Sequence, residues 1–188
     1  MKTFIQFSEA WENRIEPSSR DKGVVAATKY HSPTDYEKNS TKVGHVGDLE
    51  LHASATSGGG IKHFTWHPKD KKIHHIVYAA QNTPIEGGSH RLMYLSAHKR
   101  TSSPVKMKHV YHAILNNGHE LVGTSHSVSA KKLWHSLVND GVVHGEHPSG
   151  KKQKINPGDP THALYGDKTP EGKKVGRMTL VASKRELH

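Results

Sequence analysis

Along most of the chain after residue 23, apolar and β-branched residues recur in short runs or at a two-residue alternation, the pattern of β-strands. Over 43–54, for example, Val46, Leu49, Leu51 and Ala53 predict one half-buried strand. We predict strands over residues 24–30, 43–54, 61–66, 73–80, 91–97, 107–115, 120–125, 161–165 and 175–182.

Turn residues join some of these strands into hairpins. Between the strands at 61–66 and 73–80, Pro68 presets the first turn position, and we expect Asp70 to adopt the less common dihedral angles. The run Asn116-Asn117-Gly118 is a tight-turn signal, which predicts a second hairpin between 107–115 and 120–125.

Two segments have the three- and four-residue spacing of amphipathic helices instead. Leu133, Trp134, Leu137 and Val138 share one face of a predicted helix that Ser127 or Ser129 caps and that ends at Gly141. At the N-terminus, Phe4, Phe7, Trp11 and Ile15 form one apolar stripe, and the helix is interrupted at Glu16-Pro17.

These elements predict an α+β fold, a mostly antiparallel twisted sheet with one packed helix and a peripheral N-terminal amphipathic helix. We expect residues 1–16 to form that peripheral helix and residues 17–23 to be a polar linker. Residues 24–188 are then one basic α+β domain of ordinary size.

The opening residues Met-Lys-Thr-Phe, followed by Phe7 and by Glu9-Ala10, resemble the N-terminal segments of tailed-bacteriophage proteins that are loaded into the head. This resemblance implies that Phe4, Phe7 and Trp11 direct the protein to phage head proteins. The segment from Leu121 to Leu137, with its Leu-Trp-x-x-Leu helix, is also similar to a stretch of uncharacterised proteins of tailed phages.

Composition and charge narrow the choice of function. The chain contains no cysteine, which excludes disulfides and thiolate metal sites. We find no apolar run of membrane-spanning length and no secretory signal, so we expect no membrane partner and a location in the virion or the host cytoplasm. The 27 Lys and Arg residues against 17 Asp and Glu give a net charge of +10, which favours a polyanion as the partner.

Lysines gather at three turn-rich segments, 67–72, 147–152 and 167–174, which we expect to form one phosphate-facing rim. The candidate nucleic-acid contacts there and nearby are Lys69, Lys71, Lys72, Lys151, Lys152, Lys154, Lys173 and Lys174. Such lysines would contact DNA phosphates without sequence choice.

The 18 histidines raise the question of a metal site. In a strand, His63 and His67 would face the same side, whereas His109 and His112 would face opposite sides and so exclude local chelation. No His-Glu-x-x-His helix of a metalloprotease is present.

A longer succession, Ile-His-His-Ile at 73–76, Gly87-Gly88, Leu-Met-Tyr-Leu at 92–95 and His-Lys-Arg at 98–100, resembles the core of an HNH nuclease. The resemblance implies His74 and His98 as ligands of Mg²⁺ or another divalent metal. The same resemblance implies that His75 is the general base. The asparagine that orients this base in the family is missing, because Ser89, His90 and Arg91 occupy the place where it belongs.

Our leading hypothesis is a non-enzymatic, basic phage protein that is packaged with or bound to DNA without a cofactor, and that acts in the host after injection. The first alternative is a metal-dependent endonuclease centred on His74, His75 and His98. The second alternative is a binding module that inhibits a host defence protein.

Overall fold

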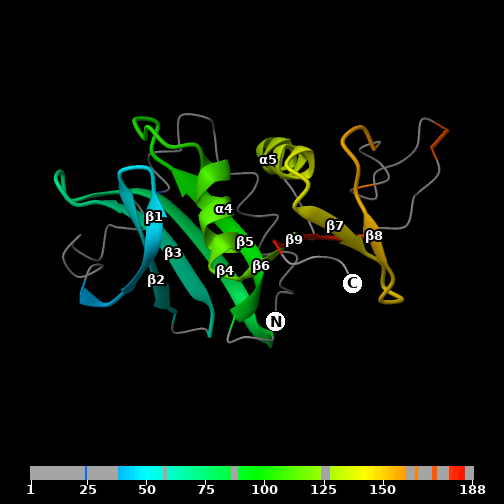
Figure 1. Ribbon diagram of the computed structural model, residues 1–188, viewed down its shortest axis with the longest axis horizontal. Coiled ribbons are helices and arrows are strands. Elements are labelled where there is room, and N and C mark those ends of the chain that lie inside the picture. Colours follow the sequence, from blue (N-terminus) through cyan, green and yellow to red (C-terminus); the bar gives the residue numbers. More distant parts are fainter. Residues whose placement is uncertain are drawn as a thin grey trace. The chain divides into compact units, whose positions relative to one another are not determined.

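The computed structural model describes Val24 and residues 38–56, 59–85, 89–123, 128–159, 164, 171–172 and 178–184 (Figure 1). The predicted N-terminal helix with Phe4, Phe7 and Trp11 and the linker at 17–23 lie outside these residues. Apart from Val24 and Leu164, so do the strands predicted over 24–30 and 161–165. The chain divides into two compact units, one of residues 1–82 and 94–113 and one of residues 83–93 and 114–188.

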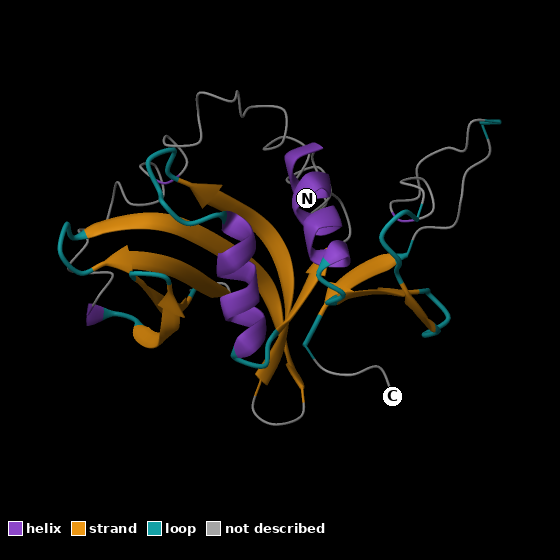
Figure 2. Cartoon of the chain, turned by 45° about the horizontal axis from the view of Figure 1, so that its top comes forward, coloured by secondary structure: helices purple, strands orange, loops and turns teal. Residues whose placement is uncertain are grey.

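The first unit contains a sheet with the strand order β1-β2-β3-β4-β5. Its strands are β1 (Thr41–Val46), β2 (Leu49–Ala55), β3 (Ile61–His67), β4 (Lys72–Ile85) and β5 (Ser89–Lys99), of which β4 and β5 also contribute residues to the second unit. From β1 to β4, each strand pairs with the next in the antiparallel sense. The helix α4 (Met107–Asn116) follows β5 and runs along these strands in Figures 1 and 2.

The predicted hairpin between residues 61–66 and 73–80 is confirmed as the β3–β4 pair, in which Phe64 lies opposite Ile76. These two side chains belong to a buried cluster with Val24, Trp66 and Ile73. Burial of this apolar surface provides the main driving force for pairing the two strands. The core therefore fixes the register of the hairpin, because a shift by one residue would turn the apolar side chains to the other face.

Two local expectations in this unit are wrong. The strand predicted over 43–54 is two strands, β1 and β2, because Gly47 adopts a φ of 61° and reverses the chain before Leu49. In the β3–β4 turn, Lys71 rather than Asp70 takes the left-handed conformation, with a φ of 54°. Asp70 instead accepts a hydrogen bond from the backbone N–H of Lys72 through its carboxylate at 3.0 Å.

The strand predicted over 107–115 is also wrong, because this segment is the helix α4. Its buried residues Val110, Tyr111, Ile114 and Leu115 recur at three- and four-residue steps, which places them on one helical face. Gly118, with a φ of 80°, donates its N–H to the carbonyl of Leu115 at 2.9 Å and ends the helix, so no hairpin joins 107–115 to 120–125. In this segment, the helical spacing of the buried residues outweighs the strand propensity of valine, isoleucine and tyrosine.

The second unit continues with the strand order β5-β6-β9-β7-β8. The new strands are β6 (Glu120–Gly123), β7 (Val143–Glu146), β8 (Lys152–Lys154) and β9 (Thr179–Ala182). The β5–β6 pair is parallel, and the pairs β6–β9, β9–β7 and β7–β8 are antiparallel. A parallel pair requires a crossover connection, and α4 provides it between β5 and β6.

The helix predicted around Trp134 is confirmed as α5 (Val128–Asn139), in which Trp134, Leu137 and Val138 are buried. Gly141 has a φ of 73° and donates to the carbonyl of Val138 at 2.9 Å, while Val142 donates to Leu137 at 3.3 Å. This pair of bonds is the Schellman arrangement that ends many helices.

The α+β class and the largely antiparallel sheet are thus confirmed for the described part of the chain. That part contains two full helices, α4 and α5, where we expected one packed helix.

A pair of glycine variants tests the close packing of β3 against β4. Gly60 is buried, and a Cβ atom there would collide with the backbone carbonyl of Ala79, whereas a Cβ atom on Gly44 would meet open space. We expect Gly60→Ala to lower the free energy of unfolding by about 1–3 kcal/mol. Gly44→Ala should change it by less than about 0.5 kcal/mol. Urea unfolding measures both, and equal effects would contradict the described packing.

Candidate nucleic-acid interface

The tip of the β3–β4 hairpin presents three exposed lysines, Lys69, Lys71 and Lys72, as the sequence predicts. The ammonium group of Lys71 lies 5.6 Å from the ring centre of Trp66, within the range of a cation–π contact. This contact holds one lysine side chain against the hairpin. All three charges remain at the solvent-facing end of the turn.

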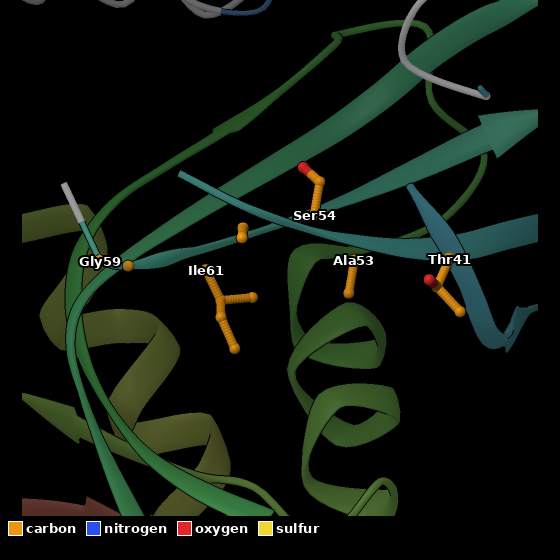
Figure 3. A pocket seen from close by; sticks show the side chains of 7 residues that line it. Thr41, Ala53, Ser54, Gly59 and Ile61 are labelled. Carbon is orange, nitrogen blue, oxygen red and sulfur yellow. The ribbon is translucent and has the colours of Figure 1, made fainter. Parts of the chain in front are cut away.

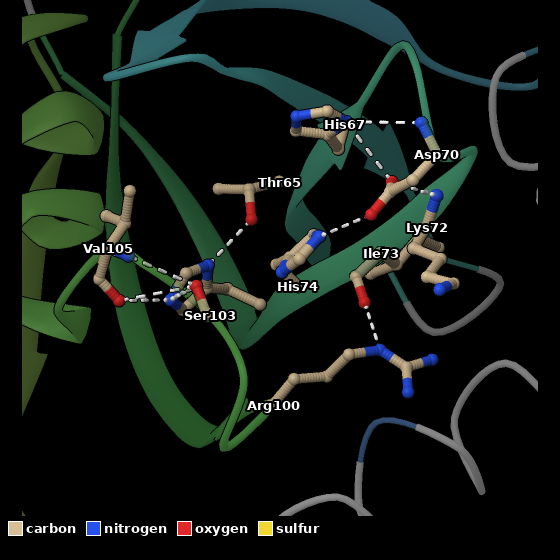
Figure 4. Close-up of polar contacts among 10 residues, drawn as sticks. Thr65, His67, Asp70, Lys72, Ile73, His74, Arg100, Ser103 and Val105 are labelled. Carbon is tan, nitrogen blue, oxygen red and sulfur yellow. Dashed lines mark hydrogen bonds and ion pairs between the residues drawn. The ribbon is translucent and has the colours of Figure 1, made fainter.

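Asp70 is the carboxylate among these lysines, and histidines of the same hairpin contact it (Figure 4). His67 lies 3.3 Å from one carboxylate oxygen and His74 lies 3.5 Å from the other. Partial burial opposes ionisation of Asp70, but the hydrogen bond from the N–H of Lys72 and the nearby histidines lower its pKa. The negative charge of Asp70 is therefore directed toward the base of the tip.

The β7–β8 hairpin carries a second group of exposed lysines, Lys151, Lys152 and Lys154. Gly150, with a φ of 82°, donates to the carbonyl of His147, and His147 donates to the carbonyl of Lys151, which closes the turn. β8 is the last strand in the sheet order of this unit, and its three residues are all exposed. Lys173 and Lys174, the third predicted group, lie outside the described residues.

Glu146, which precedes this second group in the sequence, is engaged elsewhere in the unit. Both oxygens of Glu146 accept hydrogen bonds from Arg91, each at 2.9 Å, and Arg91 also donates to Glu120 at 2.8 Å. Burial opposes ionisation of Glu146, but the bonds from Arg91 and from His144 lower its pKa. In the described part of the chain, none of the ion pairs involves the three lysines of the β7–β8 tip.

The loop between β5 and α4 is a further basic part of the first unit. Arg100 donates through Nε to the carbonyl of Ile73 at 2.6 Å, and Lys106 is exposed immediately before the helix. The first turn of α4 contains no acidic residue. Free N–H groups at a helix start favour anions, so this loop adds to the positive potential of the unit.

His75, the base of the nuclease alternative, is fully buried and bonded at both ring nitrogens. Its Nε2 lies 3.0 Å from the carbonyl oxygen of Val105, and its Nδ1 lies 2.7 Å from the hydroxyl of Thr65. A carbonyl only accepts, so Nε2 carries the proton and Nδ1 accepts from Thr65. Burial lowers the pKa of His75 to about 4, which keeps the ring neutral and ties the β5–α4 loop to the sheet.

The structure does not unite the three histidines of the nuclease alternative. His74 contacts Asp70, whereas both ring nitrogens of His75 are bonded to Thr65 and Val105. His98 is buried on β5, and burial alone lowers its pKa. Among the described residues, no group of three or more His, Cys, Asp or Glu side chains is arranged to hold a metal ion.

The expectation for His109 and His112 rested on a strand and is wrong as stated. Both residues lie on α4, where a three-residue step places them on the same side of the helix. His63 and His67 do lie on one strand, β3, as expected.

A shallow pocket of about 290 Å³ lies at one end of the first sheet (Figure 3). Thr41, Ala53 and Ile61 line it together with the glycines at 59–60. It contains no charged lining residue, so it adds nothing to the basic surfaces.

One row of hydrogen-bonded polar side chains in the first unit was not predicted from the sequence. Ser40, His52 and Glu50 are linked by hydrogen bonds, and Lys42 pairs with Glu50 at 2.5 Å. The residues are separated by up to 12 positions, and no motif spacing identifies them. The alternation of β2, which puts Glu50 and His52 on one face, is the only signal in the sequence that pairs them.

Comparisons with protein-family models, curated proteins and solved structures found no match to this chain. None of the helices in the described ranges is both long and apolar enough to cross a membrane. Charge and geometry therefore carry the functional argument.

The buried ring of His75 predicts loss of stability in mild acid. Between its unfolded pKa of 6.5 and its folded pKa of about 4, the unfolded chain binds the extra proton, so the free energy of unfolding falls as pH decreases. We expect a loss of about 2–3 kcal/mol from this group across that window. His75→Gln should flatten the curve there, because an amide does not titrate.

Urea unfolding at several pH values measures this loss of stability. NMR titration of the imidazole nitrogens provides the direct check. A His75 ring that titrates near its ordinary pKa of 6.5 would contradict the described burial and bonding.

Proposed function

We propose that this protein is a basic, phage-encoded, virion-associated protein that binds DNA non-specifically through phosphate contacts from its lysine-rich hairpin tips. The observation that carries the proposal is that each of two hairpins has three exposed lysines in or next to its turn, one set at 69–72 and one at 151–154. The tips belong to different units, and each is a phosphate contact in its own right.

The local charge balance supports this function. At the β7–β8 tip, Arg91 occupies both oxygens of Glu146, which leaves the lysines uncompensated by that carboxylate. At the β3–β4 tip, Asp70 is directed to His67 and His74. A phosphate backbone bound at either tip would neutralise the lysines of that tip and release condensed counterions.

Lysines on β8 also have a structural explanation, because charged residues on edge strands prevent pairing with other chains. That explanation accounts for Lys152 and Lys154, which lie within the strand. It does not account for the lysines of the β3–β4 tip, which lie in the turn or at the first position of β4. Phosphate binding accounts for both tips.

The nuclease alternative is less well supported than DNA binding. A general base needs a free nitrogen to take a proton from water, and both nitrogens of His75 are committed to Thr65 and Val105. The association with phage particles rests on the resemblance of residues 1–16 to head-targeting segments.

Salt dependence of DNA affinity tests the phosphate contacts. The double variants Lys71→Gln/Lys72→Gln and Lys151→Gln/Lys152→Gln should each reduce the slope of log affinity against log salt by about 2, roughly one unit for each lysine–phosphate pair removed. A matched control, Lys38→Gln/Lys132→Gln, removes two exposed lysines that belong to neither tip and lowers the net charge equally, from +10 to +8.

Fluorescence anisotropy with a short labelled duplex measures the slopes, and gel analysis of plasmid with Mg²⁺ or Mn²⁺ scores cleavage in parallel. Equal slopes in tip and control variants would assign the effect to net charge alone. Metal-dependent cleavage would favour the nuclease. Competition by a mononucleotide at low concentration would instead indicate a compact phosphate ligand.

Removal of residues 1–20 tests the association with the virion. This deletion retains Val24, which is buried in the first unit, so we expect the melting temperature to change by a few degrees at most. Incorporation into phage particles should be lost, which immunoblotting of purified virions measures. Unchanged incorporation would show that the opening residues are not the address.

A further inference from the structure

Ser40, His52 and Glu50 form a continuous chain of a hydroxyl, an imidazole and a carboxylate on the first unit. The Ser40 hydroxyl lies 3.0 Å from Nδ1 of His52, and Nε2 of His52 lies 3.1 Å from a carboxylate oxygen of Glu50. Ser40 is half-buried and immediately precedes β1, the first strand in the sheet order. Its hydroxyl therefore lies at the edge of the sheet.

The proton positions in this chain follow from the charges around Glu50. Hydrogen bonds from Lys42 and His52 lower the pKa of Glu50, so its carboxylate is ionised and only accepts. Nε2 of a neutral His52 then carries the proton, and its Nδ1 is left as an acceptor. The only donor that Ser40 can offer to Nδ1 is its hydroxyl hydrogen, so the serine is aligned to give up that proton.

The imidazole is also held in orientation. His52 is buried, and its ring stacks on Phe64 with centroids 5.3 Å apart and planes at 18°. Phe64 belongs to the buried cluster of the first unit, which anchors this stack. A carboxylate thus holds one side of this base, and an aromatic ring holds its face. A histidine base that a carboxylate orients is the arrangement that activates a serine nucleophile.

We propose that Ser40 is a nucleophile that His52 activates and Glu50 orients, and that it accepts the acyl group of a carboxylic ester. The Ser40 oxygen bonds to the ester carbonyl carbon, its proton passes to Nδ1 of His52, and the carbon–alkoxy bond breaks. The same proton leaves with the alcohol. Water then attacks the acyl-serine, and His52 transfers a proton from this water to Ser40, which releases the carboxylic acid.

The pocket next to this chain is a separate feature. Ala53 follows His52 on β2, so its side chain points to the opposite face of the sheet, and the pocket that it lines opens on that face. The ester would approach Ser40 from the sheet edge. The proposal is independent of DNA binding, since neither lysine tip contributes to it.

Covalent labelling tests the proposal without knowledge of the natural substrate. We would incubate the full-length protein with a fluorophosphonate probe, in which the serine oxygen displaces fluoride, and measure intact mass and modified peptides. We expect one adduct per chain, on Ser40. Ser40→Ala should remove it, whereas Ser54→Ala, a matched control on the neighbouring strand, should label at the wild-type rate.

Variants of the orienting residues distinguish an activated serine from a serine that is merely exposed to the probe. His52→Gln should reduce the labelling rate at least about 10²-fold, the contribution of a general base. Glu50→Gln should also reduce it, and because Glu50 is partly exposed, this variant tests the chain if His52→Gln fails to fold. An absent adduct in the wild-type protein, or equal rates in the wild-type and Glu50→Gln proteins, would overturn the proposal.

Discussion

The antiparallel pairing of β3 with β4 is the constraint on which the other described features of the first unit depend. Its register places Phe64 opposite Ile76 in the core and Thr65 opposite His75 on the other face. The same register places His67 opposite Lys72 at the tip. One set of backbone hydrogen bonds thus builds the apolar cluster, holds the neutral His75 that ties down the β5–α4 loop, and presents the tip lysines.

In the described part of the chain, three carboxylates are held by nearby partners, whereas the lysines of the two tips are exposed. Glu146 is held by Arg91, Glu50 by Lys42 and His52, and Asp70 by the base of its hairpin. Exposed ion pairs contribute little to stability, whereas unpaired lysines at turns create a local positive potential. The chain, with a net charge of +10, thus keeps exposed cationic surfaces, as the proposed DNA binding requires.

Prediction from the sequence succeeds where local chemistry and burial agree. Pro68 and the flanking apolar runs identify the β3–β4 hairpin, and Trp134 with Gly141 identifies α5 and its end. The segment of α4 is harder to predict, because its valine, tyrosine and isoleucine favour strands by type but lie at helical spacing. The turn at Gly47 gives a weak signal, because alternation continues on both sides of this single glycine.

The candidate site, too, is predictable from the sequence only in part. Lysines in polar turns are predictable as exposed, because turns lie on the surface. The engagement of Glu146 by Arg91 and the chain from Ser40 to Glu50 are not predictable, since each depends on a strand register that brings distant residues together. Sequence resemblance alone makes His75 a candidate base. Only the bonds of its ring to a threonine hydroxyl and a backbone carbonyl show that it is a buried structural tie.

Heteronuclear NMR of the full-length protein during titration with a short DNA duplex tests the central claim most directly, because it reports binding residue by residue. The account predicts that amide signals shift over residues 67–72 and 147–154, and that those of the buried cluster around Phe64 and of Trp134 stay in place. Shifts confined to other segments, or none at physiological salt, would contradict the assignment of the lysine tips as the DNA-binding surface.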